Sequence, residues 1–119
     1  MPYDVEATDE FSEWYRSLEE TVIEAVNAKM DLLVEVGWLL GRPHADTLYG
    51  SRYANLKELR VNAAGRPIRI FYAFDPRQSA IVLIGGDKTG DPNFYRRMVP
   101  VAEALYETHL AEIEEERNA

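Results

Sequence analysis

Five residues of types that can act on a phosphate group lie in, beside or shortly after three short apolar runs in the middle of the chain. They are Lys57, Arg60, Arg69, Lys88 and Tyr95. Guanidinium groups match the geometry of phosphate oxygens and stay charged. Lysine can act as a base where neighbouring cations and desolvation depress its pKa. A buried cation without a partner is costly, so these cations are either neutralised by acidic residues or placed on an open face that meets an anion.

The reaction that these residue types favour is cleavage of a phosphodiester. RNA carries its own nucleophile, the 2′-hydroxyl group. An enzyme can cleave RNA without a metal if it orients that hydroxyl and removes its proton. It must also stabilise the extra negative charge on the phosphate and protonate the 5′-oxygen that leaves. Lysine, arginine and tyrosine can supply these functions.

Other kinds of site find little support in the sequence. The chain has no cysteine, which excludes thiolate metal sites and thiol nucleophiles. His44 and His109 have no partner at ligand spacing on the same element, so we expect no metal site and no cofactor. The segment Gly85–Gly90 contains a Lys-Thr pair but lacks the spacing of a P-loop, which argues against nucleotide hydrolysis.

The net charge of −8 is unevenly distributed along the chain. Residues 41–97 carry ten cations and five carboxylates, a local charge of +5, whereas residues 1–40 carry −8 and residues 98–119 carry −5. A basic middle region favours an anionic partner such as nucleic acid. The alternative is that acidic helices pair internally with a basic sheet.

The three apolar runs predict an antiparallel three-stranded meander. Residues 55–61, 66–74 and 80–84 are rich in β-branched and aromatic residues, and turn signals at Gly65 and Asp75-Pro76 separate them. The third run is apolar on both sides, so we expect it to be the central strand. Residues 85–90 follow as a flexible, glycine-rich link.

Period-two alternation predicts which side chains share a face. In the second run, one face carries Ile68, Ile70, Tyr72 and Phe74. Arg69 and Phe71 point the other way. In the first run, Arg60 points away from Leu59 and Val61, so Arg60 and Arg69 share the non-core face if the register pairs them.

Helices are predicted before and after the meander in the sequence. Tyr3–Ala7 alternates like an edge strand, and Thr8 caps a short first helix. A capping box from Ser17 to Glu20 begins a second helix that ends at Gly37, which makes a helical hairpin. His44–Ala54 is predicted to be a loop. Asp91 and Pro92 then begin a final helix over about residues 92–115, which Pro100 breaks or kinks.

We therefore expect residues 1–119 to form one α+β domain with a single core. An N-terminal strand and a helical hairpin pack on the antiparallel meander, and a C-terminal helix follows. The N-terminus lacks the pattern of a signal peptide, and no apolar run approaches the roughly 20 residues that span a membrane. We expect a soluble, cytoplasmic protein with no membrane partner.

This order of elements resembles the RelE/HigB superfamily of type II toxin–antitoxin toxins, and most closely its phage-derived HigB-like branch. The resemblance covers about residues 3–110. It rests on the segments Leu56–Arg60, Gly65–Tyr72 and Ile81–Lys88 and on the helix after Pro92. The resemblance implies a RelE/ParE-like fold.

The resemblance also implies an activity and partners. The expected activity is that of a ribosome-dependent, metal-free mRNA endonuclease, an mRNA interferase. Its expected partners are mRNA on the ribosome and a cognate antitoxin, commonly a helix-turn-helix protein, which holds the toxin inactive. Two features depart from the family: the net charge of −8, and Lys88-Thr89 where relatives often have two basic residues.

Residue roles follow from the resemblance. Arg60 and Arg69 would hold the scissile phosphate, Lys57 and Lys88 would act as base or contact phosphate, and Tyr95 would stack on a base or handle a proton. Further substrate contacts would come from Arg52, Arg66, Arg96 and Arg97.

Two alternatives stay open from the sequence. In the first, the chain is a catalytically weak or inactive module of the same fold, which binds antitoxin or RNA through its basic sheet face. Alternatively, it is a structural or regulatory subunit whose acidic helices form the contact surface. The catalytic interpretation requires Arg60, Arg69 and Lys88 to converge rather than pair with separate carboxylates.

Overall fold

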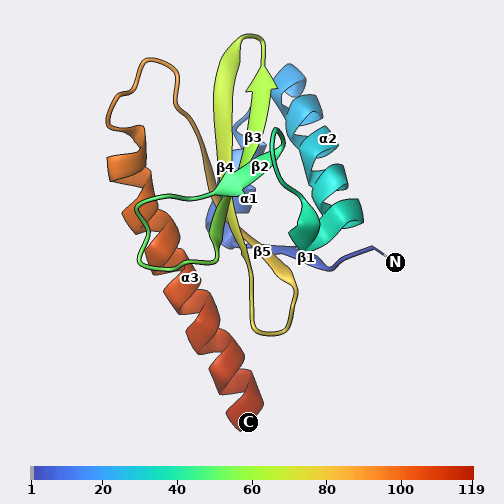
Figure 1. The fold of residues 1–119 in the computed structure, drawn as a ribbon, viewed down its shortest axis with the longest axis vertical. Helices are drawn as coiled ribbons and strands as arrows, with labels where there is room; N and C mark the ends of the chain where they lie inside the picture. Colours follow the sequence, from blue (N-terminus) through green and yellow to red (C-terminus); the bar gives the residue numbers. More distant parts are fainter. Residues whose placement is uncertain (1) are drawn as a thin grey trace.

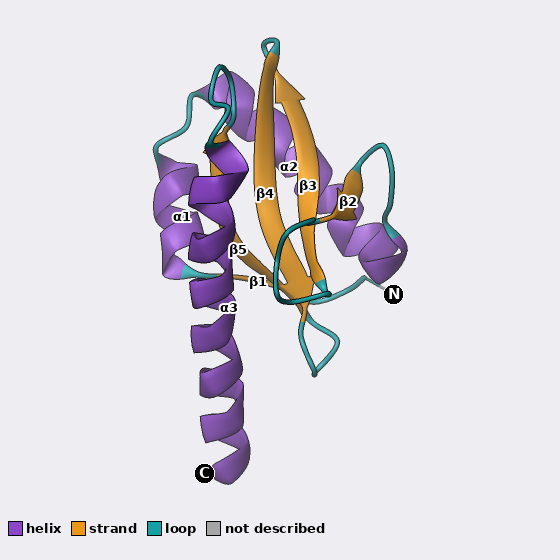
Figure 2. Ribbon diagram, turned by 60° about the vertical axis from the view of Figure 1, so that its left-hand side comes forward, coloured by secondary structure: helices purple, strands orange, loops and turns teal. Residues whose placement is uncertain are grey.

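The computed structural model describes residues 2–119 as a five-stranded sheet between helices, and Figures 1 and 2 show this layering. The strands are β1 (Val5–Ala7), β2 (Ala45–Thr47), β3 (Leu56–Ala63), β4 (Arg66–Phe74) and β5 (Ala80–Asp87). The helices are α1 (Asp9–Arg16), α2 (Glu20–Val36) and α3 (Phe94–Asn118), with a 3₁₀ turn over Gly37–Leu39. The expected α+β class is confirmed.

The strand order across the sheet is β1-β5-β4-β3-β2. The predicted meander is confirmed as β3, β4 and β5, and β1 forms an edge that runs parallel to β5. The central strand is β4 rather than β5, because β2 adds a further strand beyond β3. β5 is nevertheless internal, flanked by β1 and β4. It is apolar on both faces because Val82 belongs to one core cluster and Leu83 to the other.

Strand β2 lies inside the segment that was predicted to be a loop. It has three residues, Ala45–Thr47, and pairs antiparallel with β3. Its own residues show no strand pattern, so pairing with β3 determines its conformation.

The apolar core is divided by the sheet into two clusters, whereas the sequence predicted one. The first packs α1 and α2 on the face that carries Leu59, Ile70 and Tyr72. The second packs α3 on the opposite face, against Phe71 and Ala73. The face expected to lie outside the core therefore carries a core of its own, because alternate residues of β4 are apolar in both directions.

The helix boundaries differ in part from the sequence prediction. The Thr8 cap is confirmed, since its Oγ1 accepts a hydrogen bond from the Phe11 N–H at 2.9 Å. The capping box is wrong: Glu19 is the N-cap of α2, and the Ser17 hydroxyl donates to the carbonyl of Trp14 at 2.6 Å. α3 begins at Phe94 and runs on through Pro100 to Asn118.

Two adjacent glycines allow helices to approach β5 closely from both faces. A Cβ atom at Gly85 would lie 2.3 Å from a ring carbon of Trp14 in α1, and one at Gly86 would lie 2.9 Å from Phe94 in α3. Gly85 and Gly86 therefore belong to the packed end of β5 rather than to a flexible link. None of the helices in the described residues is long and apolar enough to cross a membrane.

A buried carboxylate joins the β4–β5 turn to α3. The Asp75 side chain is fully buried, and its Oδ2 lies 2.8 Å from His109 Nε2 and accepts a hydrogen bond from Arg77 at 2.8 Å. Its Oδ1 accepts the backbone N–H groups of Arg77 and Ser79. Burial opposes ionisation, but these hydrogen bonds outweigh it and lower the pKa of Asp75.

We expect Asp75 to make the fold acid-sensitive. Because its folded pKa lies below the ordinary value of 3.8, its contribution is present above that pH and is lost as the pH falls through the lowered value. Asp75→Asn should reduce the free energy of unfolding by about 1–3 kcal/mol at pH 7. Below pH ~4, the free energy of unfolding of the variant should fall less steeply with pH than that of the wild type. Urea denaturation between pH 7 and pH ~3 measures both effects.

Asp31→Asn is the matched control, because it removes a carboxylate from an exposed position of α2. An Asp75→Asn chain with the acid dependence of the wild type would contradict this role.

Candidate active site

The candidate site is centred on a buried carboxylate, that of Glu58 in β3. Its Oε1 atom lies 3.1 Å from Arg69 Nε and 3.6 Å from Arg60 Nε, and it accepts a hydrogen bond from the Tyr95 hydroxyl at 2.9 Å. Only 6% of the Glu58 side chain is exposed. Strands β3 and β4 and helix α3 thus bring two guanidinium groups and a phenol to a single oxygen atom.

The register of the sheet creates this cluster. Arg60 and Arg69 are direct partners across β3 and β4, which confirms that they share a face. Like charges placed directly opposite each other repel, so a carboxylate between them is needed. Glu58, two residues before Arg60 on the same face, supplies it.

The two guanidinium groups keep hydrogen-bonding capacity. Arg60 Nε and Arg69 Nε are both buried and have no hydrogen-bond partner, so their contact with Glu58 is electrostatic. Arg69 is mostly buried at 12% exposure, whereas Arg60 is 36% exposed and reaches solvent. An anion that approaches from the solvent therefore meets Arg60 first.

A second carboxylate borders the site. Asp46 of β2 is the register partner of Glu58, and its Oδ2 accepts hydrogen bonds from Arg60 at 3.2 Å and Arg42 at 2.9 Å. A hydrogen bond from the Thr47 N–H is the largest of the effects that lower the pKa of Asp46, and Arg42 adds to it. Asp46 is therefore a fixed negative charge at the outer edge of the cluster.

Lys88 and Tyr95 complete the cluster on the side of α3. The Lys88 ammonium lies 3.5 Å from the Tyr95 hydroxyl and 5.1 Å from the centre of its ring. Among residues 2–119, no carboxylate lies within ion-pair distance of Lys88. Burial, and then the hydrogen bond to Glu58, raise the pKa of Tyr95, so its phenol stays protonated and donates.

Two of the nine predicted site residues face the other side of the sheet. Lys57 is paired with Tyr72 on the α2 face, and its Nζ donates to the carbonyl of Leu40 at 3.2 Å. Arg66 lies 3.7 Å from carboxylate oxygens of both Glu19 and Asp87. Period-two alternation separates Lys57 from Arg60 and Arg66 from Arg69, so the structure does not bring Lys57 or Arg66 to this site.

The remaining three arginines lie along or next to α3. Arg97 pairs with Asp91, and Arg52 pairs with Glu107 further along the helix. Arg96, next to Tyr95, is exposed and has no ion-pair partner among the described residues. Of these three, only Arg96 lies beside the cluster without pairing with a carboxylate of the described residues.

Sequence analysis missed both carboxylates of the site. Glu58 was detectable, because it stands two residues before Arg60 and alternation places the two on one face. Asp46 was not, because its position depends on β2. Arg60 and Arg69 thus lie together and share Glu58, and Arg60 is also hydrogen-bonded to Asp46.

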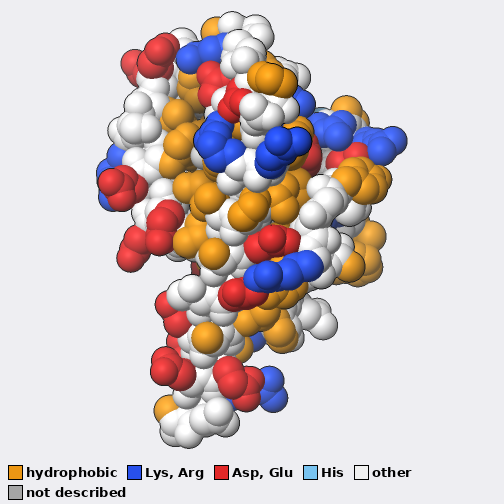
Figure 3. All heavy atoms as spheres, turned by 90° about the vertical axis from the view of Figure 1, so that its left-hand side faces the viewer, with side chains coloured by type: hydrophobic (Ala, Val, Ile, Leu, Met, Phe, Trp, Pro, Cys, Tyr) orange, Lys and Arg blue, Asp and Glu red, His pale blue; other side chains and the backbone are white. Residues whose placement is uncertain are grey.

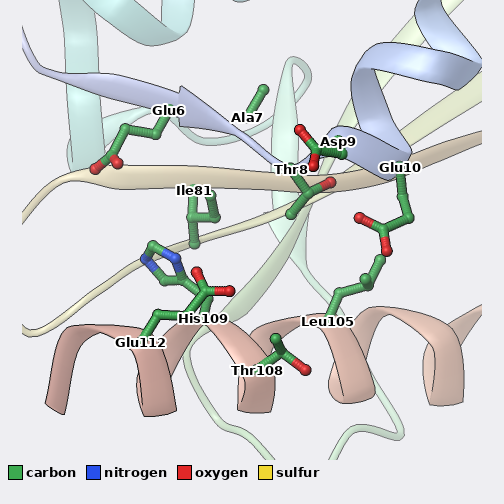
Figure 4. A pocket seen from close by; sticks show the side chains of 10 residues that line it. All are labelled: Glu6, Ala7, Thr8, Asp9, Glu10, Ile81, Leu105, Thr108, His109 and Glu112. Atoms are coloured by element: carbon green, nitrogen blue, oxygen red, sulfur yellow. The ribbon is translucent and has the colours of Figure 1, made fainter. Parts of the chain in front are cut away.

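The surface charge varies over this face of the molecule. Figure 3 shows several Lys and Arg side chains on its upper part, with acidic side chains among them, and mostly acidic side chains along the projecting C-terminal part of α3. A cleft of about 340 Å³ between the β1–α1 segment and α3 is also acidic (Figure 4). Its carboxylates belong to Glu6, Asp9, Glu10 and Glu112. An anionic ligand is therefore repelled less at the cluster around Glu58 than in this cleft.

No metal is implicated by the side chains that the structure describes. Between Pro2 and Ala119, no three His, Cys, Asp or Glu residues form a group that could hold a metal ion. The cluster around Glu58 instead combines proton donors and acceptors with fixed positive charge. These are the components that acid–base chemistry on a phosphodiester needs.

Comparison with known proteins identifies the family. The model of the family described as phage-derived protein Gp49-like matches residues 13–107. The chain belongs to this family. The match includes every residue of the cluster, from Asp46 to Tyr95.

Two curated relatives come from Mycobacterium tuberculosis. "Putative toxin HigB3" is 41% identical over 99 residues, which cover 82% of this chain and 85% of the relative. "Putative toxin HigB2" is 38% identical over 109 residues, which cover 90% of this chain but 54% of the relative. The chain thus spans about half of the length of the HigB2 protein.

Two solved structures share the fold. A mutant of the Escherichia coli toxin RelE in its free state aligns with a TM-score of 0.57 at 15% identity, covering 79% of this chain and 92% of that one. The archaeal RelE-RelB complex from Pyrococcus horikoshii OT3 aligns with a TM-score of 0.55 at 14% identity, covering 76% and 99%. The predicted RelE/HigB-like resemblance is confirmed.

We predict that Glu58→Gln converts the site into a stronger anion site. The substitution keeps an acceptor for the Tyr95 hydroxyl but removes the negative charge that offsets the repulsion between Arg60 and Arg69. Without ligand, the variant should lose about 3 kcal/mol of stability. Inorganic phosphate should raise its melting temperature by several degrees more than that of the wild type, because a ligand that binds the folded state stabilises it.

Thermal unfolding across a phosphate titration measures this difference, with Asp31→Asn as a control of equal charge change. Equal phosphate responses in all three proteins would show that Glu58 does not neutralise the arginines.

Proposed function

We propose that the chain is the toxin of a type II toxin–antitoxin system and cleaves mRNA on the ribosome without a metal. The observation that carries this proposal is the convergence of Arg60, Arg69 and Tyr95 on Glu58, with Lys88 beside Tyr95. The similarity to proteins named as HigB toxins supports the same class.

In the proposed reaction, the 2′-oxygen attacks the adjacent phosphorus while its proton moves to Glu58. Glu58 is suited to this role because its carboxylate accepts and does not donate, and Tyr95 holds it in place. Protonation neutralises Glu58 as negative charge builds on the phosphate. The charge of Arg60 and Arg69 is then released from the carboxylate and stabilises the phosphate oxygens.

The second half of the reaction needs a proton for the leaving 5′-oxygen. The Lys88 ammonium carries such a proton and is not held by a carboxylate of residues 2–119. As the bond between phosphorus and the 5′-oxygen breaks, the proton passes to that oxygen. The products are a 2′,3′-cyclic phosphate and a 5′-hydroxyl group.

We place this activity in the cytoplasm, with a cognate antitoxin as the inhibiting partner. One relative in fold is a RelE-RelB complex, which supports a protein partner that binds a toxin of this shape. We further propose that the antitoxin is a helix-turn-helix protein. A gene for a small protein of that class beside the gene for this chain would support the assignment.

A non-catalytic binding module is the second candidate. One observation favours it: Glu58 and Asp46 already offset part of the charge of Arg60 and Arg69, which weakens the attraction for RNA. Such a module would bind RNA or antitoxin in a salt-sensitive manner and leave the RNA intact.

The decisive variant is the double substitution Arg60→Ala, Arg69→Ala. Loss of one well-placed charge-stabilising donor typically slows a reaction about 100- to 1,000-fold. We expect the double variant to lose at least about 100-fold of the rate, since groups that act as a unit are not additive. Growth arrest on induced expression, with end-mapping of translation-dependent transcript cleavage, measures the effect.

Arg16→Ala, Arg117→Ala is the matched control, because it removes the same charge from exposed positions outside the cluster. Arg69→Lys keeps the positive charge but lacks the planar fork of arginine, so it separates the effect of charge from that of geometry. Wild-type cleavage by the double variant would refute the mechanism. Tight, salt-sensitive RNA binding without any cleavage by the wild type would favour the binding module.

A further inference from the structure

A shallow groove of about 270 Å³ opens directly beside the proposed active site. One wall comes from the β2–β3 loop, through Tyr49 and Gly50. The other comes from the first turns of α3, through Tyr95, Arg96, Pro100 and Glu103. The proposed mechanism does not use this groove.

Tyr95 connects the groove to the reacting groups. Its hydroxyl donates to Glu58 at 2.9 Å, while the residue also lines the groove. A ligand group in the groove is therefore one side chain away from Arg69 and Glu58. A substrate whose phosphate lies on the arginines would place a neighbouring part of the same molecule here.

The outer wall presents an uncovered aromatic ring. Tyr49 is 69% exposed and forms no ring pair with another aromatic residue of the described chain. A large exposed aromatic side chain beside a cationic site is the arrangement on which unpaired bases of RNA stack.

The loop that carries Tyr49 is held in place by α3. The Glu103 carboxylate accepts the Ser51 hydroxyl at 2.9 Å and the Arg52 N–H at 2.7 Å. The Tyr53 hydroxyl donates to Glu107 at 2.8 Å. These contacts hold the loop against the helix, so the groove exists before a ligand arrives, which lowers the ordering cost of binding.

The α3 wall offers hydrogen-bond acceptors and one free cation. Pro100 has no N–H, so the carbonyl of Arg96 loses its helical donor. The Glu103 carboxylate adds a second acceptor nearby. The Arg96 guanidinium has no carboxylate within ion-pair distance among residues 2–119, so it can contact a phosphate.

We propose that this groove binds the base of the nucleotide next to the scissile phosphate, stacked on Tyr49. Its α3 wall presents two acceptors, the carbonyl of Arg96 and the Glu103 carboxylate, so it favours adenine, cytosine or guanine, whose exocyclic amino group has two N–H donors, over uracil, which has a single N–H. Arg96 contacts the adjoining phosphate. This inference rests on the proposed function and adds to it a subsite for base preference.

Tyr49→Ala tests the stacking. Loss of one base-stacking aromatic residue should lower kcat/KM for mRNA cleavage on purified ribosomes between about 5-fold and about 150-fold. The preference for amino-bearing bases at the mapped cleavage sites should become weaker. Tyr49→Phe keeps the ring and should retain both the rate and the preference.

Trp38→Ala is the matched control, because it removes another exposed aromatic side chain, one in the 3₁₀ turn after α2 and outside the groove. A Tyr49→Ala chain that cleaves at the wild-type rate and with the wild-type preference would overturn the groove assignment while leaving the proposed function intact. Equal losses in Tyr49→Ala and Trp38→Ala would also overturn it.

A second measurement does not depend on cleavage. An mRNA with 2′-deoxyribose at the cleavage site lacks the nucleophile and stays intact. With a photoreactive adenosine placed there, ribosome-bound protein should cross-link at Tyr49 or its neighbours in the groove. Cross-links confined to other surfaces would overturn the inference, even if the wild-type chain showed no nuclease activity.

Discussion

The burial of one carboxylate between two guanidinium groups is the interaction on which the candidate site depends. Arg60 and Arg69 face each other across two hydrogen-bonded strands, an arrangement that repulsion would oppose without Glu58. The contacts of Glu58 with both arginines and Tyr95 offset the desolvation cost of its burial. The Nε atoms of both arginines are nevertheless buried without hydrogen-bond partners. Glu58 therefore offsets their charge but leaves hydrogen-bond donors unused.

Helix α3 sets the geometry of the site through contacts far from it. Its first turns deliver Tyr95 to Glu58, whereas Asp75 and His109 secure the helix near its other end. Between these points, Glu103 and Glu107 hold the β2–β3 loop. Figure 2 shows α3 lying along one side of the sheet. This single helix closes the second core, positions a functional side chain and forms one wall of the adjoining groove.

Internal pairing explains the charge pattern for some of the cations. Internal pairing accounts for Arg52 with Glu107, Arg66 with Glu19 and Arg77 with Asp75. It does not account for Lys88 or Arg96. A chain with a net charge of −8 can therefore present a local cationic surface, because screening limits the reach of distant carboxylates to about 8–10 Å at moderate salt.

The sequence by itself determined the meander, the helical hairpin and the final helix, and also which side chains within one strand share a face. These features follow from local periodicity and from turn residues, both of which are visible in the sequence. Only the tertiary structure decided that Arg60 and Arg69 are register partners with Glu58 between them, and that β2 and the Tyr49 groove exist. Those outcomes depend on strand register and on packing between distant segments, and no local pattern specifies either.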